Sequence, residues 1–302
     1  MTTKLPAVAF RNIFRNLRRS SLSAIAIAVS AMAIMALLAL LECMEADMET
    51  NLTSYYTGEI RIRHESFEKY ERYNPLHLSL DVEAVLGVAT SVDGVEAATS
   101  RINFPANLYL NGKNNGALGV GVDFAREAAF IDFPSLVTKG SIPQAGKNEL
   151  LIGAILAHEL QLEVGDKITV LTSTALRGSN AMTFEIVGIA SFPVGGLSSK
   201  TLYIPLDRAQ YMLRMEGQTQ EILLQVADGY KEADVAQSVK AELQASLGLA
   251  TETKAWKDLN MMYSLLSIAK FIYYVMAGVF FVLGSTVIIN TTMMVIYERM
   301  RE

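Results

Sequence analysis

Two uncharged apolar stretches lie near the two ends of this 302-residue chain and enclose a polar middle. The first covers residues 20–41 and the second covers residues 271–297. Each is longer than the roughly 20 residues that a helix needs to cross a hydrocarbon core about 30 Å thick. The residues between them are too polar to lie in lipid. We therefore expect two membrane-spanning helices with one large folded domain between them.

The charges around the first stretch predict its orientation. Residues 1–41 contain five basic residues and no acidic ones, whereas Glu42, Glu45, Asp47 and Glu49 follow the stretch directly. Because basic flanks stay on the cytoplasmic side, the N-terminus should be cytoplasmic. The second stretch must then return the chain to the same side. Both termini are thus expected in the cytoplasm, with residues 42–270 mostly outside it.

The predicted outer part of the chain is acidic. Without the seven basic and two acidic residues outside Glu42–Lys270, the totals of 26 and 31 fall to 19 and 29, a net charge of −10. That sign argues against nucleic acid as a partner. The chain has one cysteine, Cys43, so an intramolecular disulfide and a zinc site built from cysteines are both excluded.

Residues 1–19 are predicted to form an amphipathic helix at the cytoplasmic surface of the membrane. Apolar and basic side chains alternate there at helical spacing, with Phe10 and Phe14 on one side and Arg11 and Arg15 on the other. Such a helix lies flat in the interface between lipid and water. It is either a basic flank of the first span or a dedicated coupling element.

Both spans are expected to continue as helices outside the membrane, over residues 42–57 and 256–270. Apolar residues recur there at steps of three and four. Two such stripes favour an antiparallel pair of stalk helices. The alternative is that each stripe packs against the outer domain. A helix from Trp256 to Tyr297 would be about 60 Å long, which exceeds a bilayer. The residues predicted to couple motion along the stalks are Met44, Met48, Leu52, Tyr55, Trp256, Leu259, Tyr263 and Leu266.

The outer domain is predicted to be α+β, with two strand–helix–strand units far apart in the sequence. Units in residues 58–115 and 218–255 can pair into one small sandwich, which makes residues 116–217 a strand-rich insertion. The loops Ser173–Met182 and Ser191–Lys200 are rich in Gly and Ser and are expected to be mobile. The first unit comprises a strand at Glu59–Arg63, a helix at Val82–Thr90 and a strand at Val95–Leu110; the second comprises Glu221–Val226, Lys231–Leu247 and Ala250–Lys254.

No stretch has the pattern of a catalytic, metal or cofactor site. Residues 140–148 resemble a phosphate loop but have the wrong glycine spacing and precede a predicted strand. His158 and Glu159 begin a zinc-peptidase pattern, but Leu162 stands where its second histidine is needed. Neither span contains a charge, so an ion pathway is not expected. Gly278, Gly284 and Asn290 are instead predicted to pack the membrane helices together.

Three parts of the chain resemble the MacB/FtsX-like permeases of ABC transporters, which include the lipoprotein-releasing permeases. The first is the basic amphipathic start, residues 10–19, which leads into the first span. The second is a series of short motifs in the middle, at Asn148–Gly153, Val164–Asp166, Phe184–Gly188 and Tyr203–Leu206. The third is the end of the second span, residues 289–302.

This resemblance implies a porter-like subdomain with an inserted β-rich subdomain, in the inner membrane of a bacterium. It also implies a mechanism in which a separate cytoplasmic ATPase moves two permease copies, or this chain and a paralogue, and the stalks carry that motion outward. The cargo would be a lipoprotein, a lipid, a peptide or a drug. The residues expected near the ATPase are Arg11, Arg15, Glu298, Arg299, Arg301 and Glu302.

The chain departs from that family in one respect, because members usually have four spans and this sequence ends after the second. Residues 298–302 are expected to begin the cytoplasmic segment, and two further spans are expected to be missing. Two alternatives remain. One is a regulatory scaffold that activates a cell-wall hydrolase, and the other is a two-span sensor of an extracytoplasmic ligand.

Overall fold

The computed structural model describes residues 17–110, 112–259 and 261–300. It divides into two compact units. One unit combines Met1–Glu49 with Asn260–Glu302 and is called here the helical unit. The other, Thr50–Leu259, is called the core domain. Each is described by itself.

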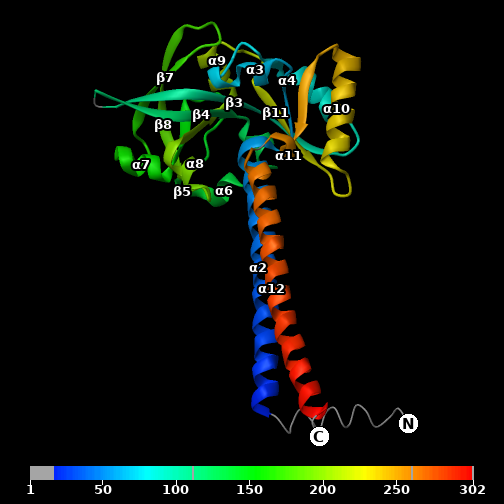
Figure 1. Ribbon diagram of the computed structural model, residues 1–302. Coiled ribbons are helices and arrows are strands. Elements are labelled where there is room, and N and C mark those ends of the chain that lie inside the picture. Colours follow the sequence, from blue (N-terminus) through cyan, green and yellow to red (C-terminus); the bar gives the residue numbers. More distant parts are fainter. Residues whose placement is uncertain (1–16, 111, 260, 301–302) are drawn as a thin grey trace. The chain divides into compact units, whose positions relative to one another are not determined.

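Two long antiparallel helices make up the described part of the helical unit (Figure 1). They are α2 (Leu17–Leu52, whose last three residues belong to the core domain) and α12 (Met261–Met300). At 1.5 Å per residue they are about 54 and 60 Å long. Lys270 of α12 forms an ion pair with Glu45 of α2 at 2.5 Å, while Gly284 lies against Ser30.

The surface of this helix pair is apolar. Phe271 and Phe281, for example, each expose more than two thirds of their side chains. Two segments, Ile27–Thr57 and Ser267–Met294, are long and apolar enough to cross a membrane. Such extensive exposed apolar surface needs lipid or other membrane helices to cover it.

Four strands of the core domain form a sheet built from two interleaved split βαβ units. Along the sheet the order is β12–β1–β11–β3, and each neighbouring pair is antiparallel. Strands β1 and β3 are therefore parallel with β11 between them, and β11 and β12 are parallel with β1 between them. The first unit is β1 (Ile60–His64), α4 (Val82–Ala89) and β3 (Val95–Leu110); the second is β11 (Glu221–Val226), α10 (Glu232–Leu247) and β12 (Thr251–Ala255).

Alternation along these strands separates an apolar face from a charged one. Ile60, Ile62 and Ile222 are fully buried in one core cluster with residues of α4 and α10. Arg61, Arg63 and Glu221 occupy the alternate positions and point to the other face. The helices thus cover one face of the sheet, and the opposite face carries charge.

Strand β3 is also part of a closed six-stranded barrel. The pairing runs β3–β4–β9–β6–β8–β7 and returns to β3. Alternate side chains of β3, from Ile102 to Leu108, fill the barrel together with residues such as Phe184 and Leu202. The other strands of the barrel are β4 (Lys113–Val122), β6 (Glu149–Gly153), β7 (Lys167–Ser173), β8 (Ser179–Ala190) and β9 (Thr201–Pro205), and β5 (Val137–Gly140) is added beside β8.

Short elements connect these strands. They are η1 (Thr53–Thr57), α3 (Phe67–Tyr70), η2 (Glu71–Tyr73), β2 (Leu80–Asp81), α5 (Phe124–Glu127), α6 (Phe133–Leu136), α7 (Ala154–Leu160), α8 (Gly195–Lys200), α9 (Leu206–Leu213), β10 (Gln218–Thr219) and α11 (Trp256–Leu259). Strands β2 and β10 pair with each other in a small second sheet.

Several expectations from the sequence need correction. The boundary at residues 115 and 116 falls inside β4, and β3 serves both parts of the domain. The segment Ser173–Met182, expected to be a loop, is largely the β7–β8 hairpin, and Gly195–Lys200 forms helix α8. Pairing of β7 with β8 organises the first segment, and burial of Leu197 in a core cluster anchors the second; local composition reveals neither.

Candidate functional site

The last turn before the sheet of the core domain has unusual backbone geometry. Residues Thr53–Thr57 form a π-helix directly after α2, and Gly58 follows with φ +62° and ψ −177°. A π-helical turn is rare and often marks a functional position. A Cβ at Gly58 would lie 2.9 Å from the Cβ of Leu223 and 3.1 Å from the carbonyl oxygen of Leu224. Only glycine fits at this close approach to β11.

A buried arginine of β3 holds this π-helical turn. Nη1 of Arg101 donates to the carbonyl oxygen of Tyr55 at 2.8 Å, and Nη2 donates to that of Ser54 at 2.7 Å. The carbonyls at a helix C-terminus lack partners inside the helix, so a cation is favourable there. Arg101 thus ties the chain that enters the core domain to the strand shared by the sheet and the barrel.

Glu127 neutralises Arg101. Arg101 donates to Glu127 through both Nε and Nη2, and the Oγ1 of Thr99 donates to the second carboxylate oxygen at 2.8 Å. Arg101 and Glu127 are 2 % and 0 % exposed. Burial opposes the charge of Arg101, but the Glu127 carboxylate outweighs this effect and raises the pKa of Arg101 above its ordinary value. Arg101 therefore keeps its positive charge inside the protein.

A second buried ion pair lies on the same charged face of the sheet. Arg63 bridges Glu221 at 2.6 Å and Glu71 at 2.8 Å, and Asn103 donates to Glu221 at 2.6 Å. Burial alone would raise the pKa of Glu221, but the guanidinium groups of Arg63 and Arg61 lower it below its ordinary value. Glu221 pairs with Arg101 in the β11–β3 ladder, so the two clusters are neighbours.

The chain leaves the core domain beside the point where it enters. The backbone N–H of Trp256 donates to the carbonyl of Glu59 at 2.9 Å, and the Trp256 side chain is buried. Helix α11 also contacts the π-helical turn. We call Ser54, Tyr55, Gly58, Arg101 and Glu127, together with Glu59 and Trp256, the entry–exit joint.

The structure distributes the predicted stalk residues over both units. Leu52, Tyr55, Trp256 and Leu259 belong to the core domain, where Leu52 and Trp256 are buried and the Tyr55 ring meets Phe192 edge-on. These four residues therefore lie in the core domain, and their part in coupling motion stays a prediction. Met44, Met48, Tyr263 and Leu266 belong to the helical unit, and Met44 is exposed.

The structure locates the predicted helix-packing residues individually. A Cβ at Gly284 would lie 3.4 Å from the Cβ of Ser30, so this glycine faces α2 closely. A Cβ at Gly278 would have no neighbour within 4 Å, and Asn290 is exposed. Within the described part of the chain, only Gly284 of these three lies against the other helix.

The residues expected near the ATPase lie at the ends of the chain. Glu298 and Arg299 are in the last turn of α12. Arg11, Arg15, Arg301 and Glu302 lie outside the described residues.

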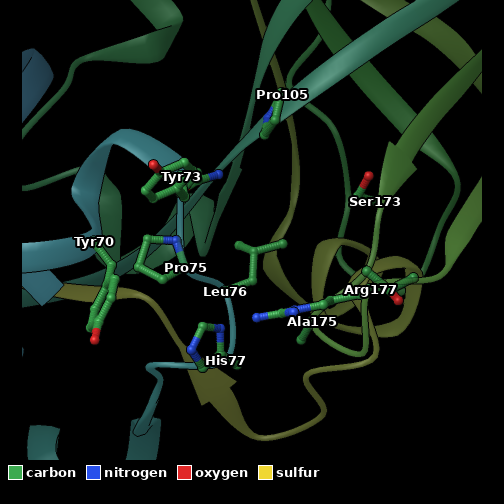
Figure 2. A pocket seen from close by; sticks show the side chains of 11 residues that line it. Tyr70, Tyr73, Pro75, Leu76, His77, Pro105, Ser173, Ala175 and Arg177 are labelled. Atoms are coloured by element: carbon green, nitrogen blue, oxygen red, sulfur yellow. The ribbon is translucent and has the colours of Figure 1, made fainter. Parts of the chain in front are cut away.

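A cavity of about 520 Å³ lies in the core domain between the segment after β1 and the β7–β8 turn of the barrel (Figure 2). One side is the segment Tyr70–His77, and the other is the turn Ser173–Arg177 with Pro105 of β3. The segment is fixed at Leu76, which is buried in the barrel core. No sequence motif indicated this cavity.

Sequence reasoning also missed Arg101, Glu127 and Glu221. The only signal was an arginine inside the predicted strand Val95–Leu110 and a glutamate at the start of Glu221–Val226. Charged residues at such positions usually point to solvent. Their burial depends on partners 26 and 158 residues away, as in Arg101–Glu127 and Arg63–Glu221.

The fold and the joint define a class: an α+β domain whose two chain connections are held together and lead to long apolar helices. A family model for the MacB-like periplasmic core domain matches residues 20–242. The chain belongs to this family and is a MacB/FtsX-like permease of the ABC transporter class. It is thus a membrane protein with an extracytoplasmic domain.

Two solved structures are similar to this chain. The extracellular domain of the noncanonic ABC-type transporter YknZ from Gram-positive bacteria is 13 % identical, covering 65 % of this chain and 98 % of that one, with a TM-score of 0.49. The periplasmic region of MacB from Actinobacillus actinomycetemcomitans is 14 % identical, covering 68 % and 92 %, with a TM-score of 0.49. No curated protein matches the chain.

Proposed function

We propose that this chain transmits motion from a separate cytoplasmic ATPase to its extracytoplasmic core domain, and thereby exports or releases a cargo. The cargo class is a lipoprotein, a lipid, a peptide or a drug. The chain itself would bind no nucleotide, and it would work as a homodimer or beside a paralogous permease. Membrane lipid would surround α2 and α12.

The entry–exit joint is the observation that supports this proposal most strongly. Arg101 bonds the carbonyls of Ser54 and Tyr55 at the end of the first long helix, and its own strand β3 belongs to both the sheet and the barrel. A displacement of that helix end must move β3 or break two charge-assisted hydrogen bonds. The joint therefore provides a stiff connection into both halves of the domain.

The proposal assigns roles to residues elsewhere in the chain. Met44, Met48, Tyr263 and Leu266 would carry the motion along the helical unit. Gly278 and Asn290, together with Gly284, would pack against membrane helices of this chain or its partner. At the cytoplasmic end, Arg11, Arg15, Glu298, Arg299, Arg301 and Glu302 would contact the ATPase.

The alternatives are distinguished by their partners. A scaffold that activates a cell-wall hydrolase would capture that hydrolase through the core domain and move no cargo. A two-span sensor would need a cytoplasmic output partner instead of an ATPase. Purification of the tagged full chain from its native membrane, with identification of what accompanies it, separates these cases.

Coupling itself is testable by hydrogen exchange without knowledge of the cargo. In the purified complex with its ATPase, ATP should change the exchange of backbone amides in residues 53–57 and in β3. Arg101→Lys keeps the charge but loses the planar guanidinium that reaches two carbonyls and Glu127. The ATP-dependent change in amide exchange should therefore shrink, while ATP hydrolysis continues. Arg126→Lys, at an exposed arginine of α5, is the matched control.

Two results would contradict coupling. One is a wild-type complex whose core domain shows the same exchange with and without ATP. The other is an Arg101→Lys complex with the full ATP-dependent change. Hydrolysis of ATP by the purified chain alone would separately overturn the assignment of the ATPase to a partner subunit.

A further inference from the structure

The cavity between Tyr70–His77 and Ser173–Arg177 has features of a ligand site that the coupling proposal does not use. Its volume of about 520 Å³ lies within the range of small-molecule sites, 300–1,000 Å³. It lies where two parts of the domain meet, which is a frequent place for such sites.

Backbone strain concentrates at this cavity. In the described residues four non-glycine residues have positive φ, and two of them, Asn74 (φ +43°) and Arg177 (φ +61°), line it. Left-handed backbone costs a non-glycine residue free energy, so surrounding contacts must hold it. Such strain is often found at ligand-binding positions.

Both strained residues are held by contacts that fix their orientation. Nδ2 of Asn74 donates to the carbonyl of Asn103 at 2.9 Å, and its Oδ1 accepts from Gln220. The turn that carries Arg177 is closed by hydrogen bonds between Thr174 and Gly178, and Ala175 binds the carbonyl of Leu213 at 2.9 Å. The backbone that carries Arg177 is thus held by a closed turn.

The lining is cationic in a domain with an excess of acids. Arg177 extends toward the side of the cavity formed by Leu76 and His77 (Figure 2). No aspartate or glutamate lines the cavity, and no ion pair of Arg177 occurs among the described residues. Tyr70 and Tyr73 add aromatic surface, and Pro75 and Pro105 add apolar surface.

We infer that this cavity binds a small organic acid, with its carboxylate on Arg177 and its apolar body against the proline and tyrosine side chains. A guanidinium matches a carboxylate through two parallel N–H···O bonds. His77 also lines the cavity, on the side toward which Arg177 extends. The inference is independent of the coupling proposal, because no residue of the entry–exit joint lines the cavity.

Benzoate is the probe for this site, and benzamide is its neutral analogue of the same shape. Both would be titrated into the full chain in lipid nanodiscs, with binding followed by saturation-transfer NMR. We expect benzoate to bind in the micromolar to millimolar range and benzamide at least tenfold more weakly. Arg177→Gln should weaken benzoate at least tenfold and leave benzamide unchanged.

Arg214→Gln is the matched control, because Arg214 does not line the cavity. Like Arg177, Arg214 is exposed and has left-handed backbone (φ +59°), and it follows Leu213, which contacts the same turn. It should change benzoate binding less than twofold, and Arg177→Lys should give an intermediate affinity. Absent benzoate binding, equal affinity of Arg177→Gln and wild type, or equal losses for both glutamine variants would overturn the inference. ATP-dependent hydrogen exchange should stay normal in Arg177→Gln, which separates this test from that of the proposed function.

Discussion

The buried pair Arg101–Glu127 shows how single residues stabilise the entry–exit joint. A buried ion pair is costly to desolvate, so its presence is weak evidence for stability by itself. Here Arg101 also donates hydrogen bonds to the carbonyls of Ser54 and Tyr55 at the C-terminal end of a helix, where a cation is favourable. We interpret the pair as a device that fixes one geometry of the joint.

Loss of one partner should therefore be severe. Arg101→Met should lower the free energy of unfolding by about 3–5 kcal/mol, because it leaves the charge of Glu127 buried and uncompensated. Urea unfolding of the full chain in detergent, followed by tryptophan fluorescence of Trp256, would measure this. Arg126→Met is the control, since the Arg126–Glu83 pair is exposed and worth at most about 1 kcal/mol. The double variant Arg101→Met with Glu127→Gln should lose less than Arg101→Met alone; an additive loss would count against a coupled pair.

Glu221 makes a pH-dependent contribution to stability. Its folded-state pKa is lowered, so the folded protein binds fewer protons than the unfolded chain near the carboxylate pKa. The contribution is complete above the unfolded pKa of about 4.3 and is lost as the pH falls through the lower folded-state pKa. Glu221→Gln should therefore be less stable at pH 7 and should show a flatter loss of stability between about pH 5 and 3.

The measurement is urea unfolding at several pH values, with Glu216→Gln as an exposed control that should keep the wild-type slope. An unchanged acid slope in Glu221→Gln would show that other carboxylates dominate this window.

At the scale of elements, Gly58 decides how the first long helix reaches the sheet. Its φ of +62° with ψ of −177° belongs to a region that essentially only glycine adopts. Gly58→Ala should cost about 2–4 kcal/mol from backbone strain and the contact with Leu223. Gly248→Ala is the matched control. Gly248 has nearly the same φ, +64°, but a ψ of 16° and no neighbour within 4 Å of a Cβ, so about 1 kcal/mol is expected.

Thermal unfolding of both variants would compare the two costs. Equal losses would mean that the close approach to β11 is unimportant and that only the positive φ matters.

The pairing of α2 and α12 is testable by a disulfide. The Cβ built at Gly284 lies 3.4 Å from that of Ser30, close to the 3.5–4.5 Å of disulfides. Ser30→Cys with Gly284→Cys, in a Cys43→Ser background, should form a crosslink on oxidation. To detect the crosslink, the chain would be cleaved at a protease site inserted in the exposed turn at Gly229. A disulfide would keep the two fragments joined until a reductant is added. Ser30→Cys with Gly278→Cys should not crosslink; efficient crosslinking there would contradict the packing.

At the scale of the whole molecule, the sequence divides into helices that need lipid and a domain that carries charge. This division accounts for the exposed apolar side chains of α2 and α12. It also accounts for the negative net charge of residues Glu42–Lys270. Both connections between the units pass through the joint, because the chain enters at Thr50 and leaves at Leu259. Any signal carried by the backbone between the units must therefore use it.

The cytoplasmic location of both termini is still a prediction from the basic N-terminus. The native thiol of Cys43, which is exposed, should react with a membrane-impermeant maleimide added to intact cells once any outer membrane is opened. Asp228→Cys in a Cys43→Ser background should react in the same way. Arg301→Cys in that background should react only after the cytoplasmic membrane is permeabilised. The opposite pattern would place the core domain in the cytoplasm.

Local pattern in the sequence determined the elements, and the tertiary structure decided their connections. Strands Val95–Leu110 and Glu221–Val226 have the predicted bounds, because periodicity acts over neighbouring residues. The apolar stretches at the ends likewise follow from composition alone. The closed barrel, the shared strand β3 and the cavity beside Arg177 were not predictable, since each depends on pairing between distant segments. The same holds for Arg101, whose burial is favourable only because folding brings Glu127 and the carbonyls of Ser54 and Tyr55 to it.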